Sequence, residues 1–237
     1  MALPKLNDMP KYSVTIPSLK QEVRIRPFVV KEEKILLVAM ESQDPKQIAH
    51  AIIDTIESCV QDDIDTQKMT SYDVEYLFTQ IRGKSVGETT NIGVPCPSCE
   101  HQNEVTVNLS EIKIHGEIPN HKINLTDNVV VEMKAPTYLQ VANNEKITGE
   151  NQSAMDRVFA LIVSSIDAVL TDEERISFKD TSYNECIEFL ESMTSDQFTK
   201  IRNYVENQPS LKHDIQFKCE GCNEDQKMTL EGMQDFF

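Results

Sequence analysis

The sequence predicts an α+β fold, with helical N- and C-terminal parts around a small central antiparallel sheet. Stretches in both halves of the chain place apolar residues at helical spacing. Residues 86–134 instead carry short strand-like runs between Gly, Pro and Asp-Asn turns. Two Cys-x-x-Cys motifs, Cys96 with Cys99 and Cys219 with Cys222, lie far apart in the chain. The matching motifs predict that the central and C-terminal regions meet.

Residues 1–85 are predicted to form a hairpin followed by helices. Apolar and polar residues alternate within 11–27, as they do in half-buried strands, and Pro17-Ser18-Leu19-Lys20 supplies the turn. Pro27 ends the second strand, since proline cannot donate to a ladder. Strong helix formers then predict a helix at 31–42, and apolar residues at helical spacing predict helices at 46–60 and 71–81.

The rest of the chain is predicted to form three further parts. Residues 86–134 make the central β region with the first cysteine pair, and 135–212 make a helical region. The expected helices of that region are 137–147, 152–169, 181–192 and 195–207. Residues 213–237 supply a strand and the second cysteine pair, which we expect to dock on the central region.

The two cysteine pairs belong to a short internal repeat. Six residues after the second cysteine, each copy has an apolar-Thr-apolar run, Val105-Thr106-Val107 and Met228-Thr229-Leu230. A Cys-x-x-Cys turn directs two thiolates at one point, and zinc takes four such ligands in a tetrahedron. We therefore expect two zinc knuckles that form one zinc-ribbon-like site, with Cys96, Cys99, Cys219 and Cys222 as the ligands of a structural zinc.

Other interpretations of these cysteines are less well supported. A disulfide framework is typical of secreted chains, and the N-terminus has no secretory signal pattern. A redox Cys-x-x-Cys motif normally occurs once, between a strand and a helix. His101 is a conceivable substitute ligand, but we favour the simpler interpretation that it is an exposed turn residue. We expect the remaining cysteines, Cys59 and Cys186, to be buried in the core.

The motifs of common enzymes are incomplete in this chain. Gly83-Lys84-Ser85 resembles the end of a phosphate-binding loop, but the required earlier glycine is Phe78. The two halves of a deaminase zinc site, His-x-Glu and then Pro-Cys-x-x-Cys, occur here in reversed order, as His115-Gly116-Glu117 and Pro95-Cys96-Pro97-Ser98-Cys99. A zinc with four thiolates has no open position for water, so we expect no enzymatic activity and no small-molecule substrate.

The composition narrows the range of partners. The formal net charge is −16, from 23 basic and 39 acidic residues, and such a protein repels nucleic-acid phosphates. No apolar run approaches the roughly 20 residues that a membrane span needs. We expect a cytoplasmic protein that binds neither nucleic acid nor membranes.

The stretch from Arg24 to Leu37, RIRPFVVKEEKILL, is unusual. Together with the paired knuckles and the terminal Phe236-Phe237, it resembles the baseplate hub protein family of T-even-like contractile-tailed bacteriophages. That family includes a hub component and a related hub assembly factor. The resemblance implies a non-enzymatic role in building the baseplate hub, with other hub and tail proteins as partners. It also implies a location in the host cytoplasm during assembly and, for a retained component, in the virion tail baseplate.

Arg24, Arg26 and Phe28 are the candidate partner-binding residues. Both arginines lie on one face of the expected strand and could bind a partner's carboxylates. The alternative is an ion pair within the chain, with Glu32 or Glu33. Phe236-Phe237 could anchor a partner or cover the protein's own core.

A function of a different class is also compatible with the sequence. The chain could be a cytoplasmic zinc-ribbon adaptor that binds other proteins in transcription or host takeover. Tail genes on both sides of its gene would favour the baseplate role over this alternative.

Overall fold

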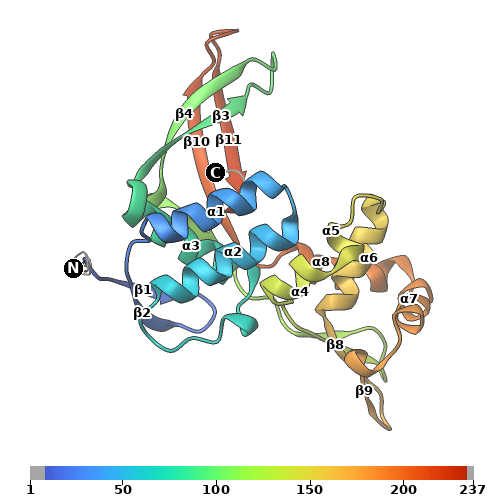
Figure 1. Cartoon of the computed structure of the whole chain (residues 1–237). Coiled ribbons are helices and arrows are strands. Elements are labelled where there is room, and N and C mark those ends of the chain that lie inside the picture. Colours follow the sequence, from blue (N-terminus) through green and yellow to red (C-terminus); the bar gives the residue numbers. More distant parts are fainter. Residues whose placement is uncertain (1–8, 234–237) are drawn as a thin grey trace. The chain divides into compact units, whose positions relative to one another are not determined.

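The computed structural model describes residues 9–233 and confirms the α+β fold class. The chain divides into two compact units, each of which has strands and helices (Figure 1). Of the described residues, the first unit takes 9–66, 72–115 and 210–233, and the second takes 67–71 and 116–209. The terminal Phe236-Phe237 pair lies outside the described residues.

The first unit begins with a β-hairpin and three helices, as the sequence predicts. Their bounds are β1 (Tyr12–Ile16), β2 (Gln21–Ile25), α1 (Val30–Ser42), α2 (Pro45–Cys59) and α3 (Ser71–Val86). Val14 and Val23 face each other in the hairpin and are both buried. The side chain of Asp44 caps α2 by accepting a hydrogen bond from the Lys46 backbone N–H at 2.9 Å, and Pro45 takes the first helical position.

The first unit continues into two antiparallel sheets. One is the hairpin of β3 (Thr89–Pro95) and β4 (Gln102–Asn108). The other has the order β11-β10-β5, built from β5 (Lys113–His115), β10 (Ser210–Lys218) and β11 (Asp225–Glu231). Figure 1 shows the β3–β4 and β10–β11 hairpins side by side, reaching away from the helices.

These two sheets share one hydrophobic core. Its buried members come from both sheets and from the segment between β4 and β5: Val94, Val107, Leu109, Ile112, Leu211, Ile215 and Leu230. Every second residue of a strand points to the same face, so each hairpin contributes one apolar face to this core. The shared core aligns the two hairpins along their length.

The second unit packs helices on a four-stranded antiparallel sheet of order β6-β7-β8-β9. The strands are β6 (Lys122–Asn124), β7 (Val130–Met133), β8 (Ile166–Leu170) and β9 (Arg175–Ser177). The helices are α4 (Tyr138–Asn143), α5 (Glu145–Thr148), α6 (Ala154–Ser165), α7 (Tyr183–Glu191) and α8 (Ser195–Glu206). Short 3-10 turns η1 (Thr66–Lys68), η2 (Leu109–Glu111) and η3 (Phe178–Asp180) complete the described elements.

Several details differ from the sequence-based expectation. The helix expected at 137–147 is interrupted at Asn144, which separates α4 from α5. The helix expected at 152–169 ends at Ser165, and 166–170 is strand β8, which pairs with β7 and β9. The strands expected within 86–134 also belong to different sheets. β6 pairs with β7, and β7 pairs with β8, in the second unit, whereas β3, β4 and β5 lie in the first.

Candidate metal centre

Each cysteine pair occupies the turn of a β-hairpin, the first between β3 and β4 and the second between β10 and β11. The backbone closes both turns in the same way. The Cys96 carbonyl accepts a hydrogen bond from the Glu100 N–H at 2.8 Å, and the Cys219 carbonyl accepts one from the Asn223 N–H at 2.9 Å. Glu100 and Asn223 both have left-handed backbone conformations, with φ of 59° and 60°. The sequence repeat is therefore also a repeat of backbone structure.

The structure brings the four predicted ligands together. The Cys96 and Cys222 Sγ atoms lie 3.8 Å apart, those of Cys99 and Cys219 lie 3.6 Å apart, and all four lie within 4.8 Å of one another. A tetrahedral zinc with bonds of about 2.3 Å separates its sulfur ligands by about 3.8 Å. The four thiols, none of which is in a disulfide, thus have the spacing of a tetrahedral metal site.

Two residues that the sequence analysis did not single out join the knuckles. The buried Asn103 accepts a hydrogen bond from the Glu220 N–H at 2.8 Å and donates one to the His101 carbonyl at 2.8 Å. A Cβ atom on Gly221 would lie 2.7 Å from the His101 Cβ and 3.3 Å from the Cys99 Sγ. Only a glycine therefore allows this close approach. The Cys-x-Gly-Cys sequence was the available signal, in a chain with only 7 glycines.

The site has one thiol that ionises more readily than usual. Backbone N–H groups, that of Cys222 first and that of Gly221 next, lower the pKa of Cys219 to about 6. The Gly221 nitrogen lies 3.3 Å from the Cys219 Sγ. A thiolate is the form of cysteine that binds metals, so this backbone arrangement favours ligation.

The other two cysteines are buried away from this site. Cys59 is fully buried and Cys186 is 1 % exposed. Burial raises the pKa of the Cys59 thiol to about 11, and it also raises the pKa of Cys186. Both are neutral packing residues, as the sequence predicts.

The candidate partner-binding residues make contacts within the chain. The Arg24 guanidinium pairs with the Asp62 carboxylate at 2.6 Å, and Arg26 pairs with Glu32 at 3.0 Å. The second pair is one of the alternatives that the sequence left open, whereas Asp62 was not foreseen. Phe28 is half-buried, and its backbone N–H donates to the Ser85 hydroxyl at 2.9 Å.

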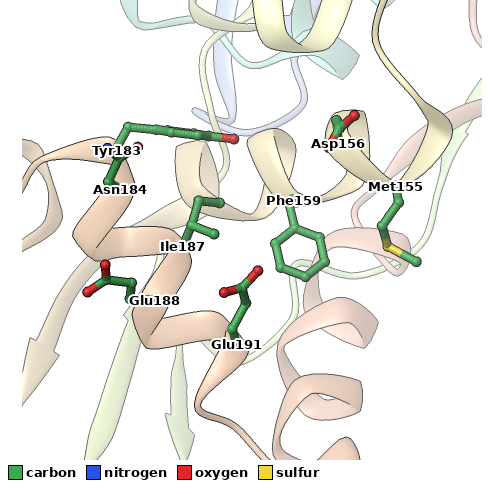
Figure 2. Close-up of a pocket in the computed structure, with 8 residues that line it drawn as sticks. All are labelled: Met155, Asp156, Phe159, Tyr183, Asn184, Ile187, Glu188 and Glu191. Atoms are coloured by element: carbon green, nitrogen blue, oxygen red, sulfur yellow. The ribbon is translucent and has the colours of Figure 1, made fainter.

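Surface grooves occur in both units. In the second unit, a groove of about 440 Å³ lies between α6 and α7 (Figure 2). Its apolar residues include Met155, Phe159 and Ile187, and its acidic groups lie apart from one another. Asp156 belongs to the cap of α6, where it accepts a hydrogen bond from the Ser153 hydroxyl at 2.7 Å. The groove in the first unit, between α1 and α2, has a volume of about 690 Å³.

Comparison with known proteins identifies the family. The family model described as "T4 bacteriophage base plate protein" matches residues 9–237, nearly the whole chain. Comparisons with curated proteins and with solved structures gave no match. Within residues 9–233, no helix combines the length and apolar character that crossing a bilayer requires. The chain belongs to the T4 bacteriophage base plate protein family.

Proposed function

We propose that this baseplate protein is a non-enzymatic component or assembly factor of the central hub, stabilised by one structural zinc. Family membership supports a role in the tail baseplate and interaction with other baseplate proteins. The resemblance of the Arg24–Leu37 stretch and the paired knuckles to hub proteins supports the hub as its place of action. Assembly would take place in the host cytoplasm.

The single observation that carries the zinc proposal is the clustering of four thiols from two separate hairpins. Cys96 and Cys99 come from the β3–β4 turn, and Cys219 and Cys222 come from the β10–β11 turn. Four sulfur ligands complete the coordination shell of zinc and leave no position at which water could be activated. The metal would therefore hold the two hairpin tips together, and its binding energy would add to the folding energy.

We assign Arg26 and Phe28 a bracing role beside a partner-binding surface, to which Arg24, in an exposed pair with Asp62, adds little. Arg26 and the Val29 backbone N–H both donate to the Glu32 carboxylate, at 3.0 and 2.9 Å, which orders the start of α1. Phe28 connects the same segment to Ser85 of α3. The segment thus holds the start of α1 in place, and other baseplate proteins contact the exposed face of that helix.

Elemental analysis of the purified protein tests the metal, with an expected value of one zinc per chain. Cys219→Ser should lose the zinc and make residues 210–233 sensitive to limited proteolysis, because the second knuckle is no longer held. Cys186→Ala is the matched control: it removes a buried thiol from the second unit and should keep the zinc. Wild-type protein without zinc, or equal protease resistance of the Cys219→Ser tail, would contradict the proposal.

A phage lacking this protein tests the hub role. We expect such a phage to make no complete baseplate hubs, and complementation with the wild-type chain should restore them. Mass spectrometry of finished tails then separates a retained component from an assembly factor that leaves the particle. Normal hubs in the phage without the protein would rule out both roles.

A further inference from the structure

Helix α1 is apolar on its outer as well as its inner side. Leu36 and Ala39 are buried against the unit. Five large apolar side chains of the same 13-residue helix are exposed: Val30 (78 %), Ile35 (41 %), Leu37 (56 %), Val38 (57 %) and Met40 (44 %). The exposed side of α1 thus carries large apolar side chains among its charged ones, and exposed apolar groups gathered on one helix mark an interaction site.

The groove between α1 and α2 has the form that receives a helix. Its apolar lining is Ile35, Val38, Ala39 and Ala51, and its volume is about 690 Å³. On α1 the lining positions recur at helical spacing over two turns, so the groove follows the helix axis, about 10 Å in that span. The small side chains of Ala39 and Ala51 allow the backbone of a third helix to approach closely.

The rim of the groove is basic, although the chain as a whole is acidic. Lys31, Lys34 and Lys46 line it together with His50, against one acidic residue, Asp54. The formal net charge of the chain is −16, so this surface differs in sign from the molecule around it. Complementary charge around an apolar contact selects the partner and accelerates its association. The groove therefore favours an occupant with carboxylates beside an apolar stripe. It disfavours the same basic surface of a second copy.

The walls of the groove are fixed before any partner binds. Arg26 and Glu32 order the first turn of α1, as described above. At the other wall, Asp44 accepts hydrogen bonds from the Lys46 backbone N–H at 2.9 Å and from the Gln47 side chain at 3.0 Å. A preformed groove avoids much of the ordering cost of binding.

We propose that the α1–α2 groove binds one amphipathic helix of another baseplate protein, with apolar residues at i, i+3 or i+4, and i+7 flanked by Asp or Glu. The apolar stripe fills the groove over Ile35 and Val38, and the acidic flanks pair with Lys31 and Lys34. Naming the partner as a baseplate protein rests on the proposed function, whereas the chemistry of the groove does not.

Two designed helical peptides of about 16 residues, long enough for marginal helicity, test the groove on the purified full-length protein. They share one Leu stripe and differ only in flanking residues, Glu in one and Lys in the other. NMR titration should show the Glu peptide binding at residues of α1 and α2, at least tenfold more tightly than the Lys peptide. The double variant Lys31→Glu/Lys34→Glu should reverse this preference. The control Lys179→Glu/Lys227→Glu makes the same charge change at exposed sites outside the groove and should leave the preference for the Glu peptide unchanged.

A photo-crosslinking amino acid at Val38, with the same group at Ile176 as control, tests the partner in infected cells. The expected product at Val38 is a cross-link to an acidic amphipathic helix of another phage baseplate protein. Equal binding of the two peptides, no binding of the Glu peptide, or binding elsewhere would overturn the groove chemistry. A Val38 cross-link to a second copy of this chain would overturn the choice of occupant. A loss of zinc or of hub assembly, by contrast, tests only the proposed function, so the two failures are distinguishable.

Discussion

Gly221 lies where the backbone of the second knuckle passes the His101 side chain of the first. An added Cβ would lie 2.7 Å from the His101 Cβ and 2.8 Å from its Cγ, closer than non-bonded carbons come. The two hairpin tips would have to separate to make room. This one glycine therefore sets the distance between the two halves of the sulfur cluster.

We predict that Gly221→Ala lowers the free energy of unfolding by about 1–3 kcal/mol, the usual cost of overpacking, and weakens zinc binding. Urea denaturation and competition with a chromogenic chelator measure the two effects. Gly93→Ala in β3 is the control, because its Cβ would meet nothing closer than 3.9 Å. A Gly221→Ala protein with wild-type stability and zinc affinity would show that the tips are loosely packed.

Glu75 in α3 is a second residue whose environment changes a measurable property, the pKa of its carboxyl group. Burial is the main cause that raises its pKa from 4.5 to about 7, and the nearby Glu231 carboxylate adds to the shift. The Met233 backbone N–H acts in the opposite direction. Because the folded-state pKa is the higher one, the protonated carboxyl favours the folded protein. This contribution is complete below about pH 4.5, decreases as pH rises and is lost above about pH 7.

We predict that Glu75→Gln removes this pH dependence. At pH 8 the variant should be more stable than the wild type by on the order of 2 kcal/mol, and near pH 4.5 the two should be similar. Urea denaturation of both proteins at a series of pH values measures the difference in their free energies of unfolding. Both proteins have the same cysteines, so any effect of acid on those thiols cancels in this difference. The control is Glu173→Gln at an exposed position, for which the difference in stability from the wild type should not change with pH. A flat difference for Glu75→Gln would show that its carboxyl reaches water.

At the scale of elements, the entry to α1 depends on a single carboxylate. Burial disfavours the ionised Glu32, but hydrogen bonds from the Val29 backbone and from Arg26 outweigh it and lower the pKa of this residue. The side chains of Arg26 and Glu32 are 17 % and 5 % exposed. Removing one partner of such a buried ion pair lowers the stability of the fold, because the other charge is left buried without a partner.

We predict that Arg26→Gln lowers the free energy of unfolding by about 2 kcal/mol, the scale of a hydrogen bond to a charged group. Arg24→Gln should have a much smaller effect, because the Arg24 side chain is 57 % exposed and solvent weakens its pair with Asp62. Thermal denaturation of both variants tests the bracing role. If Arg26→Gln keeps full stability but loses binding to baseplate proteins, Arg26 contacts the partner directly.

At the scale of the whole molecule, the four candidate metal ligands belong to one unit alone. The four cysteines all belong to the first unit, between hairpins that share a core. The second unit has its own core, which includes Val131, Ile162, Ile166 and Leu190. A metal that joins the hairpin tips therefore stabilises the first unit directly and has no ligand in the second.

We predict that chelation of zinc increases hydrogen exchange at the tips of the β3–β4 and β10–β11 hairpins and leaves α6 and α8 protected. The physical reason is that, without the proposed metal, Asn103 and a few further contacts join the tips, and tips with few contacts open locally. Hydrogen-exchange mass spectrometry of the zinc-bound and chelated proteins is the measurement. Uniform loss of protection through both units would indicate one cooperative fold instead.

Much of this structure follows from local sequence. Strong helix formers predict α1, apolar spacing predicts α2 and α3, and the alternation before Pro27 predicts the first hairpin, because propensities and periods depend on neighbouring residues. The four metal-ligand candidates also follow from sequence, since a repeated Cys-x-x-Cys turn with a strand after it has a defined local geometry. The family resemblance agrees with the family that matches residues 9–237.

Tertiary structure alone decided which distant segments meet. Residues 166–170 are apolar enough to continue α6, yet they form β8, because β7 and β9 provide strand partners on both sides. Short apolar runs fit either a helix or a strand, and the available pairing decides between them. Likewise, β5 pairs with β10 although residues 116–209 separate them in the sequence. Asn103 and Gly221 are important only because the tips of the two hairpins touch. The cysteine spacing determined which thiols are the candidate ligands, and long-range strand pairing and packing determined where the two pairs meet.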